Sequence, residues 1–336
     1  MFRSSVAVCI LVSACATSTP KPTKPSAPPE RASLTVKKAA RDCSGPLRFD
    51  SARLEEVVRA EVQVLEGPVR KSDVAALKSL WSKDLRIESL GGIECLSALE
   101  TLRFQSETAV DLAPLATLVR LRSLHLDEAV VKETEALASL QNLRKLRLRI
   151  EADTQLDGLS PLDRLESLRL WIVGAADLSP LSRLSNLWRL DVMVRAPVDL
   201  SPLAALQTVR RISLTLAVAV DLSPIGRLLD LRRLSIVARS DGVEIEVPNL
   251  RSLKHLKRLS LVLDQPTVEL SSLEGLESLK KLTLRVKGAT ALDLSSISEL
   301  TNLKSVAIFS PATVDLESLE KARPTTRFSH IRDQAE

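Results

Sequence analysis

The feature that most constrains this chain is an aliphatic residue, usually leucine, that returns at a nearly constant interval. The interval is 22 residues through Leu228 and then 25, 23 and 24 residues. The positions concerned are Val74, Leu96, Leu118, Leu140, Leu162, Leu184, Leu206, Leu228, Leu253, Leu276 and Leu300. A period of this length is the signature of a repeat array, in which each unit packs against its neighbours. We therefore expect about eleven coils over residues 74–320.

The spacing within one coil predicts its local structure. In the stretch from Asp177 to Val192, the apolar residues first recur every three positions and then after two; they are Leu181, Leu184, Leu187, Leu190 and Val192. A step of three suits a 3₁₀ or helical turn, and a step of two suits a strand. Each coil should therefore pass from a short turn on one side to a strand on the other, which predicts an α/β solenoid with a parallel sheet.

The repeated motif resembles the leucine-rich repeat family, and specifically the 22-residue repeats of bacterial internalin-like proteins. The resemblance rests on L-x-x-L-x-x-L-x-L runs such as Leu118/Leu121/Leu124/Leu126, and on the Asp-Leu-Ser-Pro tracts at Asp177, Asp199 and Asp221. It implies a solenoid whose parallel sheet lines a concave face and whose short helical or 3₁₀ turns line a convex face. It also implies a non-catalytic binding function, with a protein ligand on the concave face.

The chain departs from the family at one position. Where leucine-rich repeats usually carry Asn or Cys to bond the loop backbone, this sequence has Glu107, Ala129, Glu151, Val173, Arg195 and Ala217. The loop amides and carbonyls must then be satisfied by water or by each other. In the turns, Ser201-Pro202 suggests a Ser cap followed by Pro at the first helical position. The preceding Asp199 is expected to stabilise this turn rather than to bind a metal.

The N-terminal segment reads as an export and anchoring signal. Residues 1–14 combine Arg3 with a short apolar run, as in a secretory signal peptide. The residues before Cys15 resemble the lipobox of bacterial lipoproteins, which implies lipidation of Cys15 and, with Ala16 next, an outer-membrane location on either side of the bilayer. The alternative is an ordinary secreted protein with a free cysteine. Residues 15–42 are rich in proline and predict a disordered tether.

Residues 43–73 predict a helical N-terminal cap, because an open solenoid end would expose its hydrophobic cross-section. Ser51 is the expected helix cap, and the apolar face should contain Leu54, Val57, Val58, Val62 and Leu65. A second short helix is expected near Ser72, and residues 321–336 should form a C-terminal cap or tail. Cys43 and Cys95 either form a disulfide between cap and array or remain two buried thiols.

Charge argues against nucleic acid as a partner. The formal net charge is +5, but residues 1–42 hold seven basic and two acidic residues, which leaves 40 of each in residues 43–336. The sequence therefore offers no bulk charge for nucleic acid.

Cations are nevertheless placed on the predicted concave face. One outward position carries Lys145, Arg189, Arg211, Arg233, Arg258 and Lys281; a second carries Arg103, Arg147 and Arg169, followed by Asp191, Ser213, Ser235 and Ser260. Trp171 should project from the same face near Arg149 and Met193, and Trp and Arg are frequent binding anchors. These residues are either a ligand-binding face or charges that keep a long sheet soluble.

No constellation in the sequence predicts catalysis, a metal or a cofactor. Ser123, His125 and Asp127 alternate along one strand, but same-face neighbours lie about 7 Å apart, too far for a nucleophile and its base. The insertion at 239–248 is either a binding loop or a neutral bulge. We expect a monomeric lipid-anchored scaffold that binds a protein. The alternatives are an envelope glycan or lipopolysaccharide binder that uses the basic columns, and a structural protein without a ligand.

Overall fold

The computed structural model describes residues 41–81, 86–238, 244–265, 268–287 and 292–331. By its internal contacts the chain divides into a unit at 1–37 and a unit at 38–336, and only the second contains described residues. The predicted signal peptide, Cys15 and the tether up to residue 40 therefore lie outside the described residues, as do residues 239–243 of the insertion.

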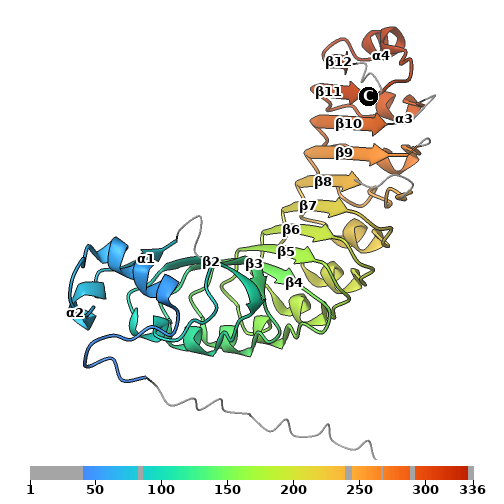
Figure 1. The fold of residues 1–336 in the computed structure, drawn as a ribbon. Helices are drawn as coiled ribbons and strands as arrows, with labels where there is room; N and C mark the ends of the chain where they lie inside the picture. Colours follow the sequence, from blue (N-terminus) through green and yellow to red (C-terminus); the bar gives the residue numbers. More distant parts are fainter. Residues whose placement is uncertain (1–40, 82–85, 239–243, 266–267, 288–291, 332–336) are drawn as a thin grey trace, which may run out of the picture. The chain divides into compact units, whose positions relative to one another are not determined.

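The second unit is built on a sheet of parallel strands arranged in sequence order (Figure 1). The described residues contain 12 strands. Their bounds are β1 Ser79–Leu80, β2 Thr101–Ala109, β3 Ser123–Val130, β4 Lys145–Ile150, β5 Ser167–Ile172, β6 Arg189–Val194, β7 Arg211–Leu216, β8 Arg233–Ala238, β9 Arg258–Asp264, β10 Lys281–Lys287, β11 Ser305–Phe309 and β12 Arg327–Ile331. β1 to β11 correspond to the eleven coils expected from the repeat, and β12 adds a strand within residues 321–336.

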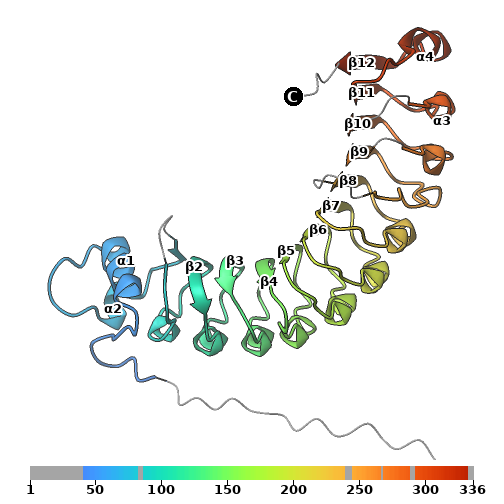
Figure 2. The same ribbon diagram turned by 45° about the vertical axis from the view of Figure 1, so that its right-hand side comes forward.

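Short helices form the opposite face of the array (Figure 2). The 3₁₀ helices are η1 Ile93–Cys95, η2 Ala113–Thr117, η3 Glu135–Ser139, η4 Asp157–Leu159, η5 Ser179–Arg183, η6 Ser201–Ala205, η7 Ser223–Arg227 and η8 Ser271–Leu273, and the last coils carry the α-helices α3 Ser295–Ser298 and α4 Leu316–Ala322. The leucines of each coil are buried between the two faces, as Leu181, Leu187 and Leu190 show with no exposed surface. The predicted α/β solenoid is confirmed.

The cap of the η helices differs from the expectation. Ser201 is the first residue of η6 and not its cap, so that prediction was wrong by one position. The backbone amide of Ser201 donates to Asp199 Oδ1 at 2.8 Å, and its hydroxyl donates to Oδ2 at 2.6 Å. Asp177 binds Ser179 in the same way. The two carboxylate oxygens of an aspartate two residues before the serine thus accept both donors at once.

Loop amides without an asparagine ladder bond directly to the preceding coil. The amides of Val173, Arg195 and Ala217 each donate to a carbonyl one repeat earlier, at 2.8 Å. At these three positions the loop amides are therefore satisfied by backbone carbonyls, which is the second of the two possibilities expected from the sequence.

The N-terminal cap consists of α1 Ala52–Val62 and α2 Lys71–Val74. Ser51 caps α1 as expected, accepting from the amide of Leu54. Leu54, Val57 and Val58 are buried, but Leu65 is 90% exposed because α1 already ends at Val62. Its inclusion in the apolar face was wrong.

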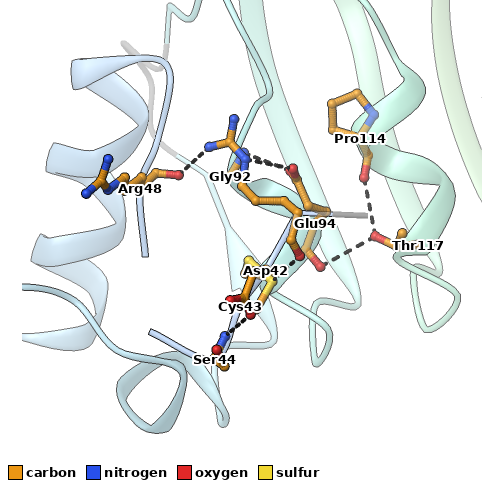
Figure 3. The surroundings of a disulfide bond; sticks show 10 residues. Asp42, Cys43, Ser44, Arg48, Gly92, Glu94, Pro114 and Thr117 are labelled. Carbon is orange, nitrogen blue, oxygen red and sulfur yellow. Dashed lines mark hydrogen bonds and ion pairs between the residues drawn. A yellow bond between two sulfur atoms is a disulfide. The ribbon is translucent and has the colours of Figure 1, made fainter. Parts of the chain in front are cut away.

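A disulfide bond joins Cys43 to Cys95, with a Cα–Cα distance of 5.6 Å (Figure 3). Around it, Arg41 donates to the carbonyl of Arg48 and forms an ion pair with Glu94 at 3.2 Å. Gly92 lies in this junction with φ of +102°, and a Cβ there would lie 2.5 Å from the carbonyl oxygen of Arg48. Cap and first full repeat are thus in close backbone contact.

Candidate binding face

The predicted cations lie side by side on the strand face because the strands are in register. Arg189, Arg211, Arg233, Arg258 and Lys281 are the first residues of β6 to β10, and each pairs with the next across adjacent strands. We call these five residues the strand-start column. Lys145 occupies the same position in β4, but Ser167 of β5 separates it from Arg189.

The second predicted position forms a neighbouring column. Arg147, Arg169 and Asp191 are register partners on β4 to β6, and Arg103 begins the column on β2. Over the following strands the column continues with hydroxyl groups, those of Ser213, Ser235, Ser260 and Thr283. A third position aligns Arg149, Trp171 and Met193.

Four of the cations over β2 to β6 form ion pairs with acidic neighbours. Asp191 accepts from Arg169 at 3.2 Å and from Arg189 at 2.8 Å, and its side chain is only 15% exposed. Arg149 pairs with Glu151 at 2.9 Å, and Arg103 lies 3.7 Å from Glu128. These pairs hold the long side chains in defined positions and set three carboxylates against the four arginines.

Trp171 lies within this ion-paired region and is half-buried. Its ring is approached by the guanidinium groups of Arg149, 6.0 Å from the ring centroid, and of Arg195, at 5.4 Å. The indole Nε1 is buried without a hydrogen-bond partner. Arg195 was not among the predicted site residues. We call Arg149, Arg169, Trp171, Arg189 and Met193 the tryptophan patch.

The cations over β7 to β10 differ, since no described acidic residue forms an ion pair with Arg211, Arg233, Arg258 or Lys281. The adjacent guanidinium groups of Arg258 and Arg211 lower the pKa of Arg233. Charging neighbouring side chains alike costs electrostatic free energy, which an anion would relieve. Four adjacent cations without a described acidic partner therefore lie together on this half of the array.

A further row of cations precedes the strands and was not predicted from the sequence. The residue immediately before each strand is Arg210, Arg232, Lys257, Lys280 or Lys304 in β7 to β11, and all five are exposed. We call them the rim row. Before β2 to β5 the same position carries ion-paired residues, as in Glu100 with Arg122 and Arg144 with Glu166, and before β6 it carries the exposed Trp188. The signal was visible in the doublets Arg210-Arg211, Arg232-Arg233, Lys257-Arg258 and Lys280-Lys281.

Two hollows follow these rows. The larger, about 680 Å³, runs over β5 to β10 from the tryptophan patch along the strand-start column, with the hydroxyls of Ser213, Ser235 and Ser260 in its lining. The second, about 460 Å³, lies between the rim row and the strand-start column from β8 to β11. We call the second hollow the rim groove. The volume of the first hollow lies within the range of small-molecule ligand sites, which is about 300–1,000 Å³.

Comparison with known proteins bears on the fold. No protein-family model and no curated protein sequence matches the chain. Among solved structures, a leucine-rich repeat protein of Leptospira interrogans is 19% identical, with 77% of this chain and 62% of that chain covered and a TM-score of 0.50. The chain has the leucine-rich repeat fold. An internalin of Listeria monocytogenes, InlF, is 21% identical over 85% of this chain and 96% of its own, with a TM-score of 0.49, and internalin C2 of that species is 21% identical over 77% and 94%, with a TM-score of 0.48.

One distance expected for the leucine-rich repeat face was wrong. Ser123 Oγ and His125 Nε2 lie 3.3 Å apart, because the two side chains lean toward each other along β3. The side chain of Asp127 lies outside the described residues.

Among the described residues, no group of three or more His, Cys, Asp or Glu is placed to hold a metal ion. No described helix combines the length and the apolar character that crossing a membrane requires.

Proposed function

We propose that this chain is a non-catalytic binding protein that recognises a protein ligand through the tryptophan patch on the strand face. The observation that carries the proposal is the half-buried Trp171, whose ring is contacted by Arg149 and Arg195 and which is aligned with Met193. Trp, Met and Arg are enriched at the cores of protein interfaces, and Trp and Arg dominate their binding energy.

The ion pairs support the same proposal. Asp191 fixes Arg169 and Arg189, and Glu151 fixes Arg149, before any ligand arrives. Side chains already held in place lose less conformational entropy on binding.

The proposal includes membrane attachment through a lipid on Cys15, at the bacterial outer membrane. Its support is the signal-like segment 1–14, the lipobox-like residues before Cys15 and the proline-rich tether at 15–42. Several acyl chains, at about 0.8 kcal/mol for each buried methylene, hold a protein on a bilayer. Labelling of the wild type with a fatty-acid analogue, absent from Cys15→Ser, tests the anchor; equal labelling of both would contradict it.

Photo-crosslinking in intact cells tests the protein ligand. A photoreactive residue replaces Met193, beside Trp171, and a matched control replaces Arg183, which is exposed on η5. We expect a protein adduct from position 193 and none from position 183. Adding Trp171→Ala should weaken capture about 30-fold, as truncation of an anchoring side chain costs about 2 kcal/mol or more.

Three results would contradict the proposal. The first is a carbohydrate adduct in place of a protein adduct at position 193. The second is capture that Trp171→Ala leaves unchanged. The third is no adduct at all from a properly exported chain, which would favour a structural protein without a specific ligand.

A further inference from the structure

The rim groove is distinguished by the chemistry of its lining. It is lined by the cationic pairs at 232–233, 257–258 and 280–281, by Lys304 and by Ser305. Seven of its eight lining residues are thus cationic, and no described acidic residue pairs with them. In the other half of the array, the equivalent Arg122 and Arg144 have glutamate partners. The groove therefore carries concentrated positive charge that the folded chain does not neutralise.

The backbone holds the two rows in step. The carbonyl of Arg232 accepts the amides of Lys257 and Arg258, and the carbonyl of Lys257 accepts those of Lys280 and Lys281. Each coil therefore presents an equivalent pair of cations, displaced by one strand spacing of about 4.8 Å. The pairs and Lys304 together cross four strands, a length of about 14 Å.

We propose that the rim groove is a second binding site, separate from the tryptophan patch, and that it takes a linear anionic polysaccharide. A site with the same pair of cations in successive coils suits a polymer with the same anionic group in successive units. A polyuronate chain has this property, since each sugar ring carries one carboxylate. Ser305 is the hydroxyl-bearing residue of the groove lining, and its side chain can bond a sugar hydroxyl.

Other polyanions fit less well. Single-stranded nucleic acid is held by stacking on aromatic side chains, and the described lining of the groove contains none. An anionic membrane is planar and would contact the exposed tips of the rim row rather than a hollow between two rows. An acidic peptide lacks the uniform spacing of charge that the equivalent coils present.

Fluorescence anisotropy with fluorescein-labelled polygalacturonate tests the inference. Binding is measured at low salt with the full chain. The rim variant combines Arg232→Ser, Lys257→Ser, Lys280→Ser and Lys304→Ser. Its side chains are exposed and its backbone hydrogen bonds remain, so the fold should persist and circular dichroism checks this. A control with the same net charge combines Arg120→Ser, Lys132→Ser, Arg183→Ser and Arg227→Ser, all exposed and outside the groove.

We expect the rim variant to bind roughly 30-fold more weakly or worse, and the control to bind within about threefold of the wild type. Raising the salt concentration should weaken the wild type more steeply than the rim variant, because fewer ions are released when the variant binds. Neutral dextran should not compete.

Several results would overturn the inference. These are equal affinities of the rim variant and the wild type, an equal loss in the control, or displacement of the label by poly-L-glutamate more effectively than by unlabelled polygalacturonate. Binding to vesicles of phosphatidylglycerol and phosphatidylcholine, lost in the rim variant, without binding to polygalacturonate would assign the cations to a membrane. Trp171→Ala should keep its affinity for polygalacturonate, so a failure of the protein-ligand proposal remains distinguishable from a failure of this one.

Discussion

Removing the disulfide between Cys43 and Cys95 should loosen the N-terminal end of the array and leave its C-terminal half unchanged. The two cysteines are separated by 52 residues. Closing a loop of this length removes about 14 cal/mol/K of entropy from the unfolded chain, equivalent to about 4 kcal/mol at 25 °C. In Cys43→Ala/Cys95→Ala the unfolded state of residues 43–95 regains that entropy.

The location of the effect follows from the architecture. In a repeat array each coil contacts only its neighbours, so stability is nearly a sum of local terms. The cap is otherwise held by burial of Leu54 and Val58 and by contacts such as the Leu47 amide with the Val69 carbonyl, at 2.8 Å. A loss of about 4 kcal/mol is a large fraction of the stability of so small an element.

Hydrogen exchange resolved by segment measures this prediction. Amides of α1 and of residues 86–102 should exchange up to about 1,000-fold faster in the double variant, while amides of β7 to β10 keep the wild-type rate. Reduction of the wild type should reproduce the pattern, which separates loss of the crosslink from loss of the side chains. Unchanged exchange in α1, or an equal increase along the whole array, would refute the reasoning.

Two further predictions concern the coil itself. Leu187→Ala, at a fully buried position, should lower the free energy of unfolding by about 2–5 kcal/mol in chemical denaturation, and a loss below about 1 kcal/mol would show that neighbouring coils fill the space. In the turns, the amide and hydroxyl of Ser179 lower the pKa of Asp177, and the hydroxyl and amide of Ser201 lower the pKa of Asp199. The folded chain thus holds these carboxylates ionised to lower pH than the unfolded chain, so their stabilisation is complete above an unfolded-state pKa of about 4 and is lost as pH falls through the folded-state pKa. Asp177→Asn/Asp199→Asn should therefore unfold earlier than the wild type at neutral pH and converge with it in strong acid, whereas a constant difference between the two curves would contradict this assignment.

Much of the fold could be predicted because one coil is a local pattern. The change from three-residue to two-residue spacing in Leu181 to Val192 placed η5 and β6 correctly. Ser51 was recognised as a cap because capping depends on the adjacent backbone only. The errors occurred where a near neighbour competed. Asp199 accepts from Ser201, which is the first residue of η6 and not its cap, and a left-handed residue, Gln63, ends α1 before Leu65.

The candidate site was predicted less completely. The sequence placed Arg147, Arg169, Trp171 and Arg189 on one face, and the register of β4 to β6 brings them together. It treated the cations as one basic surface and overlooked Arg195 and the rim row. The acids that neutralise part of this surface lie 22 residues away in the chain, as Asp191 does from Arg169, and become neighbours only when the coils stack.

The sequence by itself determined the coil, the position of each strand and the buried face on which its leucines lie. It could do so because a strict hydrophobic period allows each leucine a single buried place. Only the tertiary structure decided which cations are paired, which remain unneutralised, and that Cys43 is bonded to Cys95 rather than free. These outcomes depend on whether side chains of different coils lie within a few ångströms of one another, a distance that periodicity alone does not contain.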